Sequence, residues 1–312
     1  MDLLRYICSI TFLGGLTLGA QPNLKVDTLW SMIPQTHQYL HLKIPVGELF
    51  VNSSQVCGLS LTQLSAPNSE AELQMQEEVD GNSNQHRYLE LGTRELTPKG
   101  TESASSNLRV AGDFSSLNAY GSPEAFRSEI ALDPNLSTDL FLDLGVGATR
   151  LDLSSLSLRT LSVKSAFSDV MLTYDQPNQI NMEKLFIHAT RGDVILKQPE
   201  LAKARHIVVK NDMGHTKLII GDKHLPHSTI SVHAGTGGCT LIIDQDQPTR
   251  IIVKAGIFAD EEFGSGFTKI GDHVYANQSY TEHCQAGDRG CAHSTTVICN
   301  LDLGTLAVME KR

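Results

Sequence analysis

A short pattern of aliphatic residues returns every 21 to 24 positions between residues 140 and 256. Each unit opens with two aliphatic residues on either side of a single position, and a second such pair follows within ten residues. The opening pairs are Leu161/Val163, Leu185/Ile187, Ile207/Val209, Ile230/Val232 and Ile251/Val253, and the second pairs are Val170/Leu172, Val194/Leu196, Leu218/Ile220 and Leu241/Ile243. Two short alternating strands in a repeat of this length are typical of a β-solenoid, in which stacked coils bury their apolar edges against one another.

The predicted fold class is therefore all-β, a single-domain β-solenoid with 21–24 residues per coil and capping strands at both ends. Stacking would place the first residues of the opening pairs in one buried column and the second residues in another. A related pattern, four alternating apolar residues followed by a glycine, occurs at residues 40–51, 140–151 and 297–308. We interpret it as a strand, a glycine kink and a second strand that form an extra or capping coil. The alternative is an ordinary β-sandwich whose spacing is coincidental.

Composition divides the chain into consecutive parts. Residues 1–20 resemble a signal peptide, with one arginine, a short apolar core and small residues near Ala20. Residues 21–64 are expected to form a strand segment that packs on the solenoid. Residues 65–125 are polar, and we expect an irregular, partly disordered insertion with short strands there. The solenoid itself is assigned to residues 126–256, and residues 257–312 to C-terminal capping strands and a hairpin.

The charge balance limits the classes of partner. The formal net charge is −10 at pH 7 and the sequence contains no basic domain, which argues against nucleic acid as the main partner. Beyond the expected signal peptide, no stretch is long and apolar enough to form a transmembrane segment. The sequence therefore predicts an exported protein, periplasmic or at the cell surface or extracellular. Its oligomeric state is left open.

The cysteines bear on the compartment and on metal binding. Cys284 and Cys291 bracket a turn-like hexapeptide, so they can face each other across a hairpin as a disulfide. The alternative is a zinc site that adds His283 and His293, but its spacing matches no common metal module. An oxidising compartment favours the disulfide. The sequence assigns no partner to the remaining cysteines of the mature chain, Cys57, Cys239 and Cys299.

Motifs that would indicate catalysis are missing from the sequence. It contains no Gly-rich phosphate loop, serine nucleophile elbow or paired-histidine zinc helix. Polysaccharide-cleaving solenoid enzymes use carboxylates or basic residues on an exposed face, and Asp169 and Asp193 occupy equivalent corner positions one coil apart. The simpler interpretation is that each aspartate accepts hydrogen bonds from backbone amides at its corner. We therefore expect no catalytic residue, no metal ion and no cofactor.

Basic residues follow the first strand of successive coils at one repeated position. They are Lys164, His188, Lys210, His233 and Lys254. Alternation turns all of these side chains outward, and stacking at about 4.8 Å per coil would align them in a ladder about 19 Å long. Such a ladder on an acidic protein is a candidate binding site for an anionic envelope polysaccharide or an acidic protein partner. The alternative is a solvated edge that prevents aggregation.

The chain resembles the bacterial toast-rack family (DUF2154) and its relatives with LiaF-like or adhesin (DUF4097) domains. The resemblance rests on residues 128–135 (SEIALDPN), 142–147 (LDLGVG), 191–194 (RGDV) and 301–304 (LDLG). It covers residues 88–312, and residues 40–64 more weakly. These motifs report structure rather than chemistry. The resemblance implies an envelope location and a binding or scaffolding role.

The residues and the resemblance together predict a non-enzymatic, exported cell-envelope protein that acts as an adhesin-like or scaffold module. Two alternatives stay open. One is a carbohydrate-active solenoid enzyme, which a pocket with two or more acids and a basic residue would favour. The other is an extracytoplasmic sensor domain for envelope stress, which would need a membrane partner.

Overall fold

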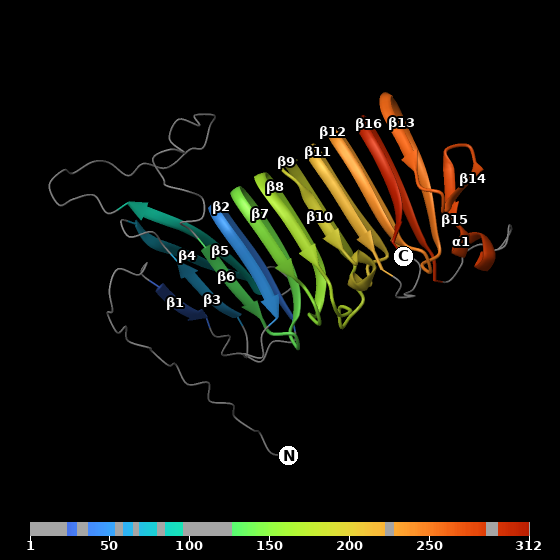
Figure 1. Ribbon diagram of the computed structural model, residues 1–312. Coiled ribbons are helices and arrows are strands. Elements are labelled where there is room, and N and C mark those ends of the chain that lie inside the picture. The colour runs from blue at the N-terminus through green and yellow to red at the C-terminus, as the bar shows by residue number, and fades with distance from the viewer. Residues whose placement is uncertain are drawn as a thin grey trace, which may run out of the picture.

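The structure is a computed structural model that describes residues 24–29, 37–53, 59–64, 69–79, 85–95, 127–221, 228–284 and 293–311. Most of these residues lie in strands, which confirms the all-β class (Figure 1). The strands are β1 (Leu24–Leu29), β2 (His37–Ser53), β3 (Leu59–Leu64), β4 (Ser69–Val79), β5 (Gln85–Glu95), β6 (Arg127–Leu132), β7 (Ser137–Asp152), β8 (Leu158–Thr173), β9 (Lys184–Arg191), β10 (Val194–Lys197), β11 (His206–Ile220), β12 (Ser228–Asp244), β13 (Thr249–Phe263), β14 (Phe267–Gly271), β15 (Val274–Asn277) and β16 (Thr295–Lys311). A 3-10 turn, η3 (Pro199–Ala202), and one helix, α1 (Gln278–His283), complete the described elements.

The long strands lie side by side in one parallel stack, in the order β2, β7, β8, β9 with β10, β11, β12, β16 and β13 (Figure 1). Each long strand supplies both strand halves of one coil, and β9 and β10 are the two halves of a single coil. The return connections are also hydrogen-bonded from coil to coil. The Tyr174 amide donates to the Lys197 carbonyl at 3.1 Å, and the Asn178 amide donates to the Leu201 carbonyl at 2.8 Å. Strands and connections therefore both repeat along the stack, as in a solenoid.

Equivalent aliphatic side chains lie on top of one another inside this stack. The register pairs Leu161 with Leu185, Leu185 with Ile207, and Ile207 with Ile230, and all four are 0% exposed. The second column runs through Val163, Ile187, Val209 and Val232, also 0% exposed. The predicted columns are thus the core. A β-sandwich of antiparallel sheets would not produce this parallel register.

Glycines occupy the corner where most of the long strands bend. Those with positive φ are Gly47, Gly147, Gly192, Gly214, Gly237 and Gly304. The register places Gly47 opposite Gly147 and Gly214 opposite Gly237. A Cβ atom on Gly147 would lie 1.9 Å from the Gly47 carbonyl oxygen, so these two coils stack this closely because neither corner carries a side chain.

The C-terminal strand differs from the expected capping segment. β16 lies inside the stack, parallel to β12 on one side and to β13 on the other. Val297 of β16 therefore joins the first core column between Ile230 and Ile251. Ile230 and Ile251 share the predicted column but are not direct neighbours, because the apolar pattern at residues 297–308 fits the same columns as any other coil.

The N-terminal end of the stack continues through shorter strands. The first half of β2 pairs with β5 and its second half with β6, both parallel. β6 pairs antiparallel with β3, which pairs with β1, and β4 pairs antiparallel with β5. The segment 65–125 thus contains two strands of 11 residues, longer than expected, because polar side chains do not prevent a strand on an open sheet. The expected signal peptide, residues 1–20, lies outside the described residues.

At the other end of the stack, β15 pairs antiparallel with β13, and β14 pairs antiparallel with β15. The sequence predicts a hairpin in this region. Asn277 joins this hairpin to the last turn of the stack. Its side chain accepts a hydrogen bond from the Thr249 amide at 3.0 Å, donates to the Gln247 carbonyl at 2.8 Å and caps α1 by accepting from the Tyr280 amide. This end of the sheet is therefore covered locally by a short antiparallel pair.

Candidate binding face

The predicted basic residues do align on the outer face of the first strand halves. They belong to a charged column that runs through Lys43, Asp143, Lys164, His188, Lys210, His233, Asn300 and Lys254. Asn300 lies between His233 and Lys254 because β16 lies between β12 and β13. The stretch from Lys164 to Lys254 therefore spans five coil steps, about 24 Å.

Acidic residues neutralise the middle of the charged column. Asp212 contacts two of its members, His188 Nε2 at 2.9 Å and Lys210 Nζ at 3.0 Å. The hydrogen bond from His188 lowers the pKa of Asp212 below its ordinary value of 3.8, and Lys210 adds to this effect against partial burial. His233 Nε2 lies 3.4 Å from Asp302. The column is thus a mixed charge ladder rather than a basic stripe.

Two lysines of the charged column contact no carboxylate within the described part of the chain. They are Lys164 and Lys254, both exposed, whereas Lys43 forms an ion pair with Glu90 at 2.7 Å. The ion pair between Asp212 and Lys210 could have been predicted from the sequence, because the two residues are two positions apart and alternation puts both on one face. Only the structure shows that Asp212 also reaches His188 in the neighbouring coil.

An aromatic column runs beside the charged column, one alternation step earlier on each strand. Its members in register are Tyr88, His41, Phe141, Ser162 and Phe186, followed by Val208, Ser231, Ile298 and Ile252. The His41 ring stacks on Tyr88 at 4.4 Å and on Phe141 at 4.5 Å between centroids. The sequence pattern did not predict these stacked rings, because the pairing of β5 with β2 is not encoded in the repeat.

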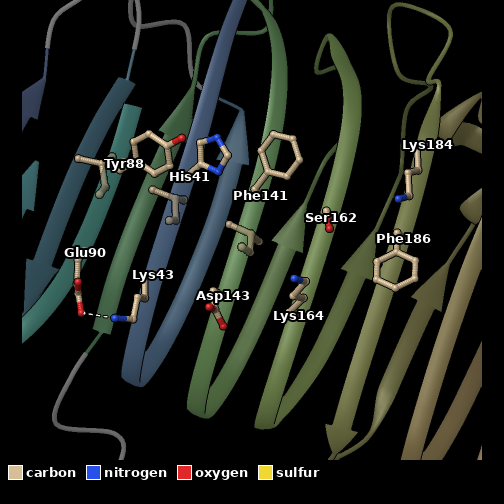
Figure 2. Close-up of a pocket in the computed structure, with 13 residues that line it drawn as sticks. His41, Lys43, Tyr88, Glu90, Phe141, Asp143, Ser162, Lys164, Lys184 and Phe186 are labelled. Carbon is tan, nitrogen blue, oxygen red and sulfur yellow. Dashed lines mark hydrogen bonds and ion pairs between the residues drawn. The ribbon is translucent and has the colours of Figure 1, made fainter. Parts of the chain in front are cut away.

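The two columns border a hollow of about 730 Å³ on this face. Figure 2 shows Ser162 between Phe141 and Phe186, with Asp143 and Lys164 beside it. Ser162 is the one small member of the aromatic column among these coils, so the rings on either side of it stand apart. The hollow is therefore open to solvent and lined by aromatic, hydroxyl and charged groups.

A serine, a histidine and an aspartate meet at the start of β2 and β7. Ser137 Oγ lies 2.9 Å from His37 Nδ1, and His37 Nε2 lies 3.0 Å from Asp139 Oδ2. Arg159 binds both carboxylate oxygens of Asp139. Burial opposes ionisation of Asp139, but hydrogen bonds from Arg159 and the other donors outweigh it and hold its pKa below 3.8. Because Arg159 already balances the carboxylate, we interpret this cluster as a tie between β2, β7 and β8 rather than a catalytic triad.

The structure also assigns a role to the aspartates that the sequence offered as candidate acids. Asp169 Oδ1 accepts a hydrogen bond from the Asp193 backbone amide at 2.8 Å, and Asp193 Oδ1 accepts one from the His215 amide at 2.9 Å. Each carboxylate thus binds a backbone amide, as the simpler interpretation expected, but the amide belongs to the next coil. These two aspartates link coils at the corner.

Cys284 takes part in a disulfide. Its predicted partner Cys291 lies outside the described residues, so the Cys284–Cys291 pairing stays a prediction. Cys239 and Cys299 are free and 0% exposed. A hydrogen bond with Cys239 and complete burial raise the pKa of the Cys299 thiol well above its ordinary value. Cys57 also lies outside the described residues.

The described residues contain neither a metal-binding cluster nor a membrane-spanning helix. No three His, Cys, Asp or Glu side chains in this part of the chain are grouped so that they could hold a metal ion. Within the same ranges, no helix has the length and apolar character needed to cross a membrane.

Comparison with known proteins leaves the family open. The sequence matches no family model, and no curated protein is similar to it, so membership of the toast-rack family or its relatives stays a prediction. A proposed cell adhesion protein from Clostridium sporogenes ATCC 15579 is similar in structure, with a TM-score of 0.39 and 12% sequence identity over 93% of this chain and 100% of that one. At this level of similarity, the function has to be inferred from the residues of the chain itself.

Proposed function

We propose that this protein is a non-enzymatic, exported module of the cell envelope that binds an extended anionic polymer along the outer face of its first strand halves. The observation that carries the proposal is the unbroken register of the charged and aromatic columns across successive coils. A polymer that lies along these columns contacts several coils at once, so weak contacts add along its length. An extended surface of this kind suits an adhesin-like or scaffold role.

The arrangement of carboxylates supports binding rather than cleavage. Glu90 is ion-paired with Lys43, and both side chains are largely exposed, at 44% and 56%. Asp169 and Asp193 are bound to backbone amides. These three carboxylates therefore already have partners in the structure, which supports binding rather than acid catalysis by them.

Two features support export. The N-terminal twenty residues have the pattern of a signal peptide, and Cys284 is disulfide-bonded. Disulfides persist in oxidising compartments outside the cytoplasm. Fractionation of cells that express the full-length chain tests this part of the proposal. Recovery of the protein in the cytoplasm with an intact N-terminus would contradict it.

The binding itself is tested with residues 21–312 immobilised on a surface. We expect polygalacturonate to be retained and uncharged dextran to pass, with retention decreasing as salt rises. Lys164→Gln combined with Lys254→Gln should weaken retention about tenfold or more, because neither lysine contacts a carboxylate among the described residues. Lys210→Gln is the matched control and should have a smaller effect, since Asp212 already neutralises Lys210. Equal retention of dextran and polygalacturonate would contradict the proposal.

A carbohydrate-active enzyme is the second candidate, because Glu90 and Asp143 both line the hollow together with lysines. Their strands lie on either side of β2, so the two backbones are about 9.6 Å apart. An inverting glycosidase holds its two carboxyl groups about 6.5–9.5 Å apart. Release of reducing sugar ends or unsaturated products from polygalacturonate would favour this candidate. The release would have to disappear in both Glu90→Gln and Asp143→Asn.

A further inference from the structure

The neighbours of Ser162 in the aromatic column limit the width of the hollow above it. Phe141 and Phe186 are two strands apart, so their backbones are separated by about 9.6 Å. A flat ring in contact with carbon atoms on both sides needs about 7–8 Å. The remaining space accommodates the pucker of a saturated six-membered ring. A backbone separation of about 9.6 Å is therefore of the size that one ring between two side chains requires.

The walls and the floor of this gap differ in chemistry. Phe141 and Phe186 offer half-buried aromatic side chains, while Ser162 places a hydroxyl between them (Figure 2). Within the described ranges, Ser162 makes no hydrogen bond through its side chain. A pyranose matches this arrangement, because its C–H face packs on aromatic carbon while its hydroxyls bind polar groups at the rim.

Charged groups surround the gap and determine which charge on a ligand is favoured there. Lys164 Nζ is free of carboxylates in the described part of the chain, and Lys184 Nζ lies 5.0 Å from the Phe186 ring centroid. Asp143 lies on the same rim and forms no ion pair with a described residue. Two cations favour a carboxylate on the sugar, and Asp143 can accept hydrogen bonds from hydroxyls.

We propose that the hollow over Ser162 is a subsite for one acidic pyranose unit of a polysaccharide. The ring lies between Phe141 and Phe186 over the Ser162 hydroxyl, with its carboxylate toward Lys164 and its hydroxyls toward Asp143. This inference rests on the proposed function, because the subsite is one position on the face that would bind the polymer. Ser162 sets the place of the subsite, since a larger side chain there would fill the gap.

Ser231 provides a matched control for this subsite. It occupies the same outward column as Ser162, but its register neighbours are Val208 and Ile298 rather than aromatic rings. Both serines are partly exposed, so a phenylalanine at either position extends into solvent and should leave the fold intact. Thermal unfolding of both variants checks this point.

The test measures binding of hexagalacturonate to residues 21–312 by calorimetry, with maltohexaose as the neutral probe. Ser162→Phe should weaken hexagalacturonate binding about tenfold or more, while Ser231→Phe stays within about twofold of wild type. Phe186→Ala should weaken both sugars. Lys164→Gln should remove the preference for the acidic sugar, because it removes the cation nearest the carboxylate.

Several outcomes would overturn the subsite. One is wild-type affinity in Ser162→Phe, and another is an equal loss in Ser231→Phe. A third is displacement of the sugar by polyglutamate at the same concentration of charge. If polyglutamate binding is also weakened by Ser162→Phe, the ligand would be an acidic peptide instead. Retention of polygalacturonate that depends on Lys164 and Lys254 but not on Ser162 would reject the subsite and leave the proposed function standing. Absence of retention in the wild type would reject both.

Discussion

Gly237 lies directly opposite Gly214 in the neighbouring coil, and a Cβ atom on Gly237 would lie 2.1 Å from the Gly214 carbonyl oxygen. Gly237 also has a φ of 142°, which side-chain-bearing residues rarely adopt. Both conditions arise from the corner, where the backbone of one coil bends over the backbone of the next.

Gly237→Ala should therefore lower the free energy of unfolding by about 3 kcal/mol or more, because steric overlap adds to backbone strain. Urea unfolding followed by circular dichroism measures the loss. Gly271→Ala is the control, since its Cβ would meet nothing closer than 3.5 Å and its φ is not positive. A loss at Gly237 no larger than at Gly271 would show that the corner can relax.

The position of β16 gives a second prediction. Because β16 pairs with β12 and β13 on its two sides, a chain that ends at Ser294 leaves both strands with an unpaired edge. It also removes the buried residues Val297 and Cys299 from the core. We expect this truncated chain to aggregate or lose cooperative unfolding, measured by size-exclusion chromatography and thermal unfolding. A monomeric chain that unfolds cooperatively would mean that β12 and β13 can pair directly.

Acid should destabilise the protein through its paired aspartates. The pKa values of Asp139 and Asp212 are lower in the folded chain than their ordinary value of 3.8. The stability that each carboxylate contributes is therefore complete above pH 3.8 and is lost as the pH falls through the lowered folded pKa. Urea midpoints measured between neutral pH and about pH 2 should fall most steeply at the acid end.

Asp139→Asn is the matched variant for this experiment. It should be less stable than wild type at neutral pH, because Arg159 loses its bidentate partner. It should also lose less stability on acidification than wild type does. An unchanged acid profile in the variant would assign the acid sensitivity to other carboxylates.

The buried thiols should be protected in the folded state. Cys239 and Cys299 are 0% exposed, and their mutual hydrogen bond together with burial raises the pKa of the Cys299 thiol. In residues 21–312 with Cys57→Ser, we expect a disulfide-exchange reagent to label neither thiol at neutral pH until denaturant is added. Rapid labelling of the native chain would contradict the burial that the structure shows.

Substitution of Tyr174 is expected to raise the stability of the protein, whereas the substitutions above lower it. Its hydroxyl is buried in the core without a hydrogen-bond partner among the described residues, and burial raises its pKa. Tyr174→Phe removes an unsatisfied polar group and keeps the ring. We expect the variant to gain up to about 1 kcal/mol in the free energy of unfolding. A loss of stability would indicate that a bound water satisfies the hydroxyl.

The outward columns show how much of the candidate site the sequence could predict. Alternation within one strand fixes which side chains face outward, so the repeat alone places Lys164 and His188 in one column. The partner of His188 could not be placed in this way, because Asp212 reaches it from another coil at the bend of β11. The hollow also depends on tertiary structure, since His41 and Tyr88 line it only because β2 pairs with β7 and β5 pairs with β2.

The sequence by itself determined the coil, its two buried aliphatic columns and the glycine at its corner. These features follow from side-chain alternation and backbone sterics, which act over a few residues. Only the tertiary structure decided the order of the coils, including the place of β16 between β12 and β13. The physical reason is that every coil presents the same aliphatic columns, so the apolar pattern allows many neighbours. The choice among them depends on contacts between residues far apart in the chain.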